Sequence, residues 1–378
     1  MTQKATSGEA ELIVGDSLTN SDLYYATHFV VGVPVMYLNV AGEKTLLVND
    51  LEYGRAGDEA RVDALVSTTP YEEQLRKLDR APSLTAILDL FLTEKGIKRL
   101  IVPGSFPFGH AQRLQAVGYE LEVRADPFIP ERIVKTPEEI EAIIEVQNHA
   151  EEAMGIAVDL LRKSEIRGDS LWSNGKQLTA ETVRVEMQKF LLEKSCEASA
   201  IIVAGGDQGA DPHHRGSGPL PANQTIVIDV FPHSTESLYW GDMTRTFVRG
   251  RADAKLKQLY KDVLDAQEAA LAAIRDGVPG NEVHEAVVDH FKECGRENGE
   301  TNGKKTGFIH STGHGLGLDI HELPRLGRQA TPLRTDQVVT VEPGLYYPGF
   351  GSVRIEDLGI VTSDGCRNLN RFPKELEI

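Results

Sequence analysis

Cysteine is scarce in this chain of 378 residues: Cys196, Cys294 and Cys366 lie far apart, and no two of them form a CxxC pair. This usage excludes a disulfide framework and a zinc–thiolate site. Long apolar runs are also missing. The N-terminal stretch MTQKATSGEAELIVGD contains none long enough for a signal peptide, and no later segment approaches a transmembrane length. These absences predict a cytoplasmic protein.

Basic residues are outnumbered, with 40 Lys and Arg against 57 Asp and Glu, for a formal net charge of -17. An acidic surface repels phosphate backbones and anionic lipid, so nucleic acid and membranes are excluded as expected partners. Hydrophobic residues make up 40% and charged residues 26%, which is ordinary globular composition. Because 378 residues exceed one ordinary core, two domains are expected.

Strand-like and helix-like patterns alternate through the first third, which predicts a small α/β domain over residues 1–131. An Ala41-Gly42 pair between two strand patterns suits a hairpin turn. No catalytic constellation is evident in this part of the chain. The expected elements are strands over 33–40 and 44–50, a helix over 84–94 and a strand from Arg99.

A proline-rich stretch marks the junction between the two expected domains. Prolines 127, 130 and 137 are expected to hold the chain extended, and Thr136 is the predicted N-cap of a helix reaching about Leu161. Helix patterns and then strand patterns follow, so residues 132–378 are predicted to form an α+β domain with helices around an antiparallel sheet. The further helices are expected over 179–193, 254–275 and 281–293.

Two aspartates lie on neighbouring strand-like segments, TIVID ending at Asp229 and YWGDMTRT containing Asp242. A hairpin that pairs them also pairs Phe231 with Trp240 and leaves a four-residue turn at 234–237. Directly paired residues share a face, about 4.5–5.5 Å apart. Carboxylates that close repel each other unless a cation lies between them. The alternative is that one aspartate is merely an edge or turn residue.

A histidine and two further acids complete the candidate set. His314 lies in GHGLG, where flanking glycines are expected to let backbone approach a ligand closely. Glu342 in VEPG and Glu356 in RIED lie within apolar strands, where an unpartnered carboxylate is costly. One such acid suits a salt bridge, but two of them beside the aspartates and the imidazole indicate metal. Four carboxylates with one imidazole suit Mn²⁺, Fe²⁺, Co²⁺ or Zn²⁺ over Cu⁺.

These motifs resemble the pita-bread metallopeptidases, which include methionine aminopeptidase, aminopeptidase P and prolidase. The segment FIHSTGHGLGLDIHELPRL, from Phe308, is very similar to the corresponding prolidase segment, and VEPGLY, VRIED and GDMTRT also match. All five metal positions occur in the family's order. The resemblance implies a pita-bread catalytic domain over 132–378, while the first third resembles a creatinase-type accessory domain in position and pattern.

By this resemblance, the site holds two divalent metal ions. Asp242 and Glu356 would bridge them, Asp229 would chelate one, and His314 with Glu342 would complete the other. Manganese ranks first as the metal, with cobalt and zinc as alternatives.

The resemblance also implies the groups that act on the substrate. His213 and His321 would stabilise the oxyanion or bind the substrate carbonyl, and Glu342 would shuttle a proton; His214 is the one-residue alternative to His213. The substrate-binding candidates are Arg325, which would read a substrate carboxylate or lie on a surface loop, Tyr346, which would line the site or be a loop aromatic, and Arg354, which would orient Glu356.

The implied activity is that of an Xaa-Pro dipeptidase, in which a hydroxide bridging the metals attacks the bond before proline. Aminopeptidase P activity on longer peptides is the alternative. A creatinase-type hydrolase or a non-catalytic binding module is less favoured, because such relatives often lose metal ligands and none is replaced here. The resemblance implies a homodimer. One departure is Phe231, which stands where the family commonly has glycine, in a hairpin two residues longer.

Overall fold

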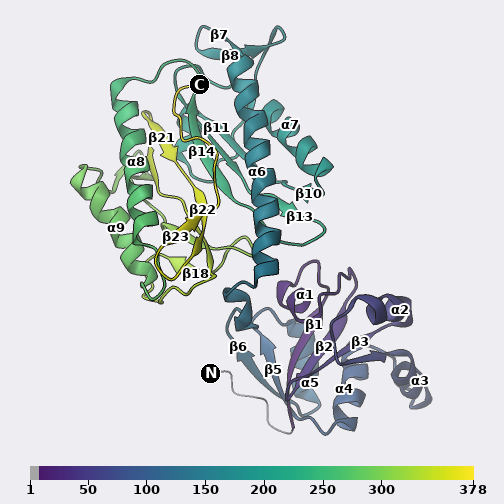
Figure 1. Ribbon diagram of the computed structural model, residues 1–378. Coiled ribbons are helices and arrows are strands. Elements are labelled where there is room, and N and C mark those ends of the chain that lie inside the picture. The colour runs from purple at the N-terminus through teal and green to yellow at the C-terminus, as the bar shows by residue number, and fades with distance from the viewer. Residues whose placement is uncertain (1–7) are drawn as a thin grey trace. The chain divides into compact units, whose positions relative to one another are not determined.

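The computed structural model describes residues 8–378; the first seven residues, part of the stretch used above to argue against a signal peptide, lie outside the described residues. The chain divides into two compact units, the first ending at Arg132 and the second running from Ile133 to Ile378 (Figure 1). Within residues 8–378, no helix is both long enough and apolar enough to cross a membrane.

The N-terminal unit is built on a six-stranded mixed sheet in the order β4-β3-β2-β1-β5-β6. Alternate side chains fill two cores, one on each face, as Leu12 and Ile13 of β1 illustrate. Ala41 and Gly42 turn the predicted hairpin with φ of 54° and 101°. The elements are β1 (Glu9–Gly15), α1 (Ser21–Thr27), β2 (Val35–Val40), β3 (Glu43–Val48), α2 (Asp50–Glu59), β4 (Ala64–Ser67), α3 (Thr69–Lys77), α4 (Leu84–Glu94), β5 (Arg99–Pro103), α5 (Phe108–Ala116) and β6 (Glu120–Arg124).

The junction is less extended than its prolines suggest, because a 3₁₀ turn, η1 (Pro130–Ile133), lies within it. Proline is tolerated in the first turn of a helix, where its missing N–H has no partner to lose, so Pro130 begins this turn without cost. The long helix α6 (Pro137–Lys163) then begins as predicted. Thr136 and Glu139 form a reciprocal capping box at its start, and it ends two residues beyond the predicted Leu161.

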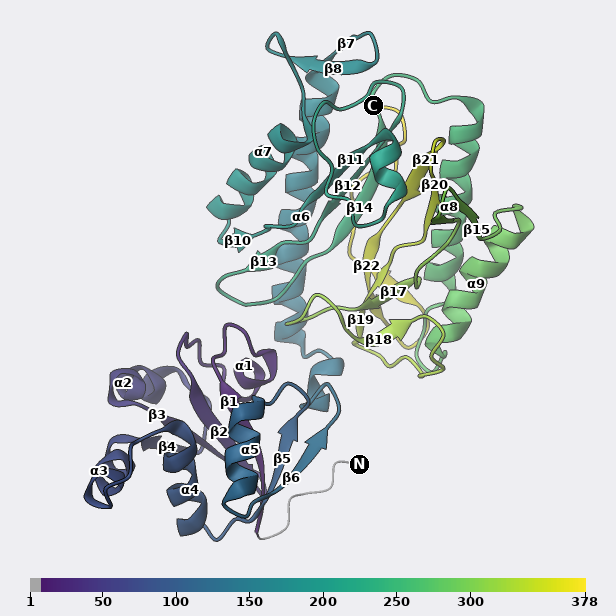
Figure 2. The same cartoon turned by 180° about the vertical axis from the view of Figure 1, so that it is seen from behind.

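The C-terminal unit places strands between two helix pairs, with α6 and α7 on one side and α8 and α9 on the other (Figures 1 and 2). Its principal sheets are antiparallel, in the orders β11-β12-β14 and β18-β17-β19-β22-β23. The other helices are η2 (Gly206–Ala210), α7 (Ala180–Glu193), α8 (Ala254–Ala273) and α9 (Gly280–Glu293).

The strands of the C-terminal unit contribute to two cores. One core joins β11, β12 and β14 to α6 and α7, and the other joins β19, β20 and β21 to α8 and α9. The strands are β7 (Glu165–Arg167), β8 (Ser170–Ser173), β9 (Lys176–Gln177), β10 (Cys196–Glu197), β11 (Ile202–Gly205), β12 (Thr225–Val230), β13 (His233–Ser234), β14 (Met243–Val248), β15 (Gly299–Thr301), β16 (Lys304–Thr306), β17 (Gly313–Gly315), β18 (Glu322–Leu326), β19 (Val338–Val341), β20 (Gly344–Tyr347), β21 (Gly351–Arg354), β22 (Asp357–Val361) and β23 (Cys366–Asn368).

Candidate metal centre

Two of the predicted ligands, Asp229 and His314, lie on strands. The other three lie just outside strand ends, so the predicted positions of Glu342 and Glu356 within strands were wrong. Asp229 lies between Ile228 and Val230, which pack against α6 and α7, so its side chain points to the opposite face. Glu342 and Glu356 each follow a residue that packs against α8 and α9. All five predicted ligands line one cavity of about 600 Å³. Strand alternation thus gathers carboxylates from separate parts of the chain.

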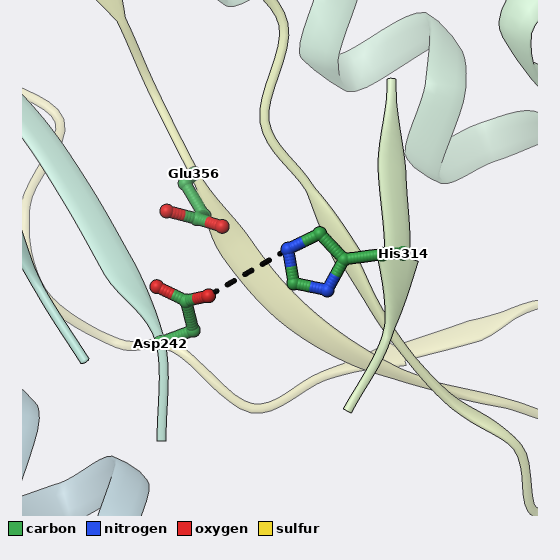
Figure 3. Close-up of side chains that lie close together, drawn as sticks. All are labelled: Asp242, His314 and Glu356. Carbon is green, nitrogen blue, oxygen red and sulfur yellow. Dashed lines mark ion pairs between the residues drawn. The ribbon is translucent and has the colours of Figure 1, made fainter. Parts of the chain in front are cut away.

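Three of these side chains point toward one another (Figure 3). Asp242, His314 and Glu356 are buried, and each offers one ligand atom within 4.8 Å of the other two. His314 Nε2 lies 3.8 Å from Asp242 Oδ2 and 3.3 Å from Glu342 Oε1. The structure therefore brings together residues 242, 314, 342 and 356, which are spread over more than a hundred positions of sequence.

The hairpin that carries the aspartates has a different register from the predicted one. Asp229 lies opposite Thr244, not Asp242, and the pairing continues to a bridge between His233 and Trp240. The predicted register was wrong by two residues. Because side chains alternate with a period of two, the shift leaves both aspartates on the same face.

The tip of this hairpin packs against the segment that precedes β18. The Trp240 backbone N–H donates to Gly317 O at 3.0 Å, and its indole N–H donates to Leu318 O at 3.1 Å. The His233 ring stacks on Trp240 with centroids 4.4 Å apart. The bonds to Gly317 and Leu318 are long-range, so local turn preferences could not reveal them. Beyond the bridge between His233 and Trp240, the tip is longer than the predicted four residues.

His314 is held as a neutral imidazole with one nitrogen facing the acids. Its Nδ1 lies 3.1 Å from Gly315 O, an arrangement in which Nδ1–H donates and Nε2 keeps a free lone pair. Burial, with a smaller effect from His321, lowers the pKa of His314 to about 3. A neutral imidazole with an exposed lone pair is the form that binds metal ions.

The glycines beside His314 allow close packing of the backbone. A Cβ at Gly313 would lie 1.9 Å from Thr340 O, and one at Gly315 would lie 2.2 Å from Leu323 O. Neither distance is sterically possible. The glycines thus let β17 pass between its neighbouring segments, which positions His314.

Burial and mutual repulsion act on the acids of the cavity. Burial, and then the charges of neighbouring acids, raise the pKa values of Asp242 and Glu356 well above their ordinary range. Burial raises the pKa of Glu342 to about 8. Asp229 accepts a 2.7 Å hydrogen bond from Arg354 through Oδ2, while its buried Oδ1 has no hydrogen-bond partner among residues 8–378. The ionised forms of these carboxylates are stabilised when positive charge enters the cavity.

The sequence match agrees with this geometry. A family model described as Metallopeptidase family M24 matches residues 141–363, more than half of the chain. The chain belongs to this family. The predicted resemblance to the pita-bread metallopeptidases is therefore confirmed, and the α+β catalytic fold with it.

Relatives of this metallopeptidase include a curated protein and solved structures. The chain is 30% identical over 348 residues to the Xaa-Pro dipeptidase of Pyrococcus horikoshii, a match covering 90% of this chain and 88% of that one. It is similar to the structure of the Xaa-Pro dipeptidase from Bacillus anthracis, with a TM-score of 0.82, 27% identity, and coverage of 98% and 95%. The X-Pro aminopeptidase from Thermotoga maritima, at 23% identity, shares the fold with a TM-score of 0.79 over 98% and 97% of the two chains.

The donor set of this metallopeptidase fits divalent cations. Four carboxylates and a neutral imidazole form a hard, oxygen-rich site, and the partnerless Oδ1 of Asp229 marks a ligand position that no protein group occupies. The metal, when bound, offsets the repulsion that otherwise favours protonation of Asp242, Glu342 and Glu356.

Metal affinity should therefore depend on pH. Because the pKa of Glu342 is raised to about 8 in the metal-free protein, a proton must leave before its carboxylate binds a cation. We expect Mn²⁺ affinity to rise as the pH increases from 6 towards 8, with protons released on binding. Calorimetric titration in buffers of different ionisation enthalpy measures both effects. Affinity that is constant over this range, without proton release, would contradict the assignment.

The predicted residues outside the ligand set also line the cavity. They are His213, His321, Arg325, Tyr346 and Arg354. His214 is not among the lining residues; its Nδ1 accepts a 2.9 Å hydrogen bond from the Gly216 N–H. Arg354 bonds Asp229 directly and contacts the Glu356 side chain only through Thr244, so the predicted partnership with Glu356 is indirect.

Some groups that shape the site escaped sequence reasoning. Gln147 on α6 is almost fully buried, accepts from the Asp242 N–H at 2.8 Å and donates to the Asp242 carbonyl at 2.9 Å. His310 lies 2.9 Å from the Tyr346 hydroxyl, and burial lowers its pKa to about 4. The crowding of three histidines over 310–321 was the only signal for His310. No local pattern indicates Gln147, which lies 95 residues from its partner.

Proposed function

We propose that this metallopeptidase is an Xaa-Pro dipeptidase that hydrolyses the peptide bond before a C-terminal proline. The observation that carries the proposal is the convergence of four carboxylates and a neutral imidazole in a cavity that also contains Arg325. Metal ligands alone indicate hydrolysis, whereas a guanidinium beside them suits a substrate that ends in a carboxylate. Similarity to the Xaa-Pro dipeptidase of Pyrococcus horikoshii supports the same specificity.

In the proposed centre, Asp242 and Glu356 would serve both metal ions, Asp229 would serve one, and His314 with Glu342 would serve the other. The metals supply Lewis acidity and lower the pKa of a water molecule to near neutrality. Thr244 donates a 2.8 Å hydrogen bond to Glu356 Oε2, which fixes the orientation of that carboxylate.

The remaining chemistry falls to residues of the cavity wall. Oxygen of the water bonds to the carbonyl carbon before proline, and the bond from that carbon to the proline nitrogen breaks. Glu342 accepts the water's proton and delivers it to the proline nitrogen. His213 and His321 donate to the oxygen on which negative charge develops. Burial lowers the pKa of His321, so its ring is neutral and one of its nitrogens carries a proton to donate.

Proline itself suits this site. An Xaa-Pro bond is a tertiary amide without an N–H, and the ring fixes φ, so a peptidase that binds strands through that N–H loses a contact. A cavity that anchors the chain end and encloses the ring does not need it. Apolar side chains of Ile309 and Ile320 line the cavity together with the polar groups.

Hydrolysis assays on metal-stripped protein test the proposal. We expect Mn²⁺, Co²⁺ or Zn²⁺ to restore cleavage of Leu-Pro, with Leu-Pro-Ala cleaved much less efficiently. Preferential cleavage of the tripeptide would establish the alternative, an aminopeptidase P. Metal-bound protein that cleaves neither peptide would contradict Xaa-Pro specificity altogether.

Replacing Arg325 by Met tests whether this residue binds the substrate carboxylate. A charge-assisted hydrogen bond contributes about 1.5–3 kcal/mol, so KM for Leu-Pro should rise roughly 10- to 100-fold with kcat nearly unchanged. The amidated substrate Leu-Pro-NH2 lacks the carboxylate and should bind wild type and variant alike. Arg334→Met, outside the cavity lining, is the matched control. An equal loss on both substrates would show that Arg325 does not read the carboxylate.

Several finer expectations stay predictions. Manganese as the resident metal, a cytoplasmic location and a homodimer rest on the sequence and the resemblance. The same holds for a creatinase-like N-terminal domain over 1–131 and a catalytic domain over 132–378.

A further inference from the structure

Phe231 occupies a place in the cavity wall that the revised hairpin register defines. Val230 lies opposite Met243, and His233 lies opposite Trp240, so the intervening Phe231 faces Asp242 across the hairpin. It also follows Asp229 by two residues, which puts both side chains on one face. An aromatic ring therefore stands beside the two aspartates of the centre, and it lines the cavity.

A second apolar side chain adjoins the same aspartate from the other direction. Ile202 of β11 pairs directly with Asp229 of β12, and Ile202 also lines the cavity. Directly paired residues project from the same face of a sheet. Ile202 and Phe231 thus form an apolar wall around the Asp229 end of the centre.

The proposed carboxylate reader lies on a different sheet from β11 and β12. Arg325 of β18 pairs with His314 of β17, so the guanidinium belongs to the His314 end of the centre. A dipeptide whose carboxylate is bound by Arg325 and whose peptide bond lies at the acids must place its first side chain at the other end. That end is the wall of Ile202 and Phe231.

We propose that Phe231, supported by Ile202, is the residue that selects the side chain preceding proline and favours apolar ones such as Leu and Met. The proposal rests on the proposed Xaa-Pro function. Phe231 is half-buried, so part of its ring faces the cavity and is available for contact. Covering that surface with a substrate side chain removes apolar area from water, whereas Gly offers nothing to cover it. An acidic side chain placed against this apolar wall loses water without gaining a hydrogen-bond partner and is disfavoured.

The test compares Leu-Pro, Gly-Pro and Glu-Pro with wild type, Phe231→Ala and Phe231→Leu. We expect Phe231→Ala to lower kcat/KM for Leu-Pro on the order of 10-fold while Gly-Pro changes less than about 2-fold. Phe231→Leu, which keeps an apolar side chain, should retain most of the preference and covers the case in which Phe231→Ala folds poorly. Phe350→Ala removes an exposed ring outside the cavity lining and should leave the ratio of the two substrates unchanged.

The outcomes distinguish a failure of the role proposed for Phe231 from a failure of the proposed Xaa-Pro function. A Leu-Pro to Gly-Pro ratio that falls only in the Phe231 variants supports the proposal. An unchanged ratio, or an equal loss on both substrates, overturns it and leaves the Xaa-Pro function standing. Metal-loaded wild type that cleaves none of the three dipeptides overturns the proposed function and the selection rule with it.

Discussion

Replacing Glu356 by Gln should abolish hydrolysis while stabilising the metal-free protein. Glu356 is proposed to hold both metals, and losing several kcal/mol of transition-state stabilisation lowers kcat on the order of 10³-fold or more. Gln keeps an oxygen that accepts the bond from Thr244, so local packing is preserved. Steady-state hydrolysis of Leu-Pro at saturating Mn²⁺ measures the loss.

The stabilising half of this prediction follows from the sign of the pKa shift. Burial and the Asp242 charge raise the pKa of Glu356 above its ordinary value of 4.5 in the metal-free fold. The folded state therefore resists ionisation, and its disadvantage grows as the pH rises above 4.5. Gln removes this cost, and each kcal/mol relieved should raise Tm by roughly 2–4 °C.

Thermal melts of the metal-free proteins at pH 4 and pH 7.5 check this effect. The variant should exceed wild type at pH 7.5, and the difference should shrink at pH 4. Glu141→Gln, an exposed change on α6, is the matched control and should alter neither activity nor Tm. A destabilised Glu356→Gln protein, or one that retains activity, would contradict the role given to this carboxylate.

Replacing Arg245 by Met should produce the largest loss of stability. Arg245 and Asp357 form a fully buried ion pair at 2.8 Å, and Arg245 also donates to the carbonyls of Thr244 and Glu356 at 2.9 and 2.6 Å. Burial alone would raise the pKa of Asp357, but the charges of Arg245 and Lys374 hold it below its ordinary value. Removing one partner of a buried pair costs about 3–5 kcal/mol. Lys374, 2.6 Å from Asp357 Oδ2, would then be the cation left beside the buried carboxylate.

Calorimetry of the Mn²⁺-loaded protein measures the consequence, a fall in Tm of roughly 6–20 °C for the C-terminal unit. Since Arg245 holds the backbone of Thr244 and Glu356, Mn²⁺ affinity should fall as well. The control is Arg162→Met, whose exposed pair with Glu375 at 3.4 Å should contribute less than about 1 kcal/mol. Equal effects of the two substitutions would show that the buried pair does not anchor the ligand strands.

Sequence reasoning reached the candidate ligands because metal binding needs recognisable residue types, and the structure brings these residues to one cavity. Glu342 and Glu356 are acids within apolar sequence, where a carboxylate without a partner is costly, and that pattern can be recognised from the sequence alone. The helix over 84–94 and the N-cap at Thr136 were equally local predictions, and the structure confirms both.

Features that depend on contacts between residues far apart in the chain could not be predicted from the sequence. The hairpin register depends on Trp240 bonding the 317–318 segment, and no turn rule contains that information. A Cβ at either glycine beside His314 would clash with the carbonyl of Thr340 or Leu323, and only the folded sheet brings these carbonyls near. Gln147 likewise positions Asp242 from a helix in another part of the chain. The wrong register did not affect the predicted site, because a slip of two residues keeps every side chain on the same face of the sheet.

Anomalous scattering from crystals of the Mn²⁺-loaded protein tests the central claim most directly. The account predicts two peaks about 3.5–4 Å apart in the cavity, with Asp242 and Glu356 touching both, Asp229 touching one, and His314 with Glu342 touching the other. A single peak, or manganese bound outside this cavity while Leu-Pro is still hydrolysed, would contradict it.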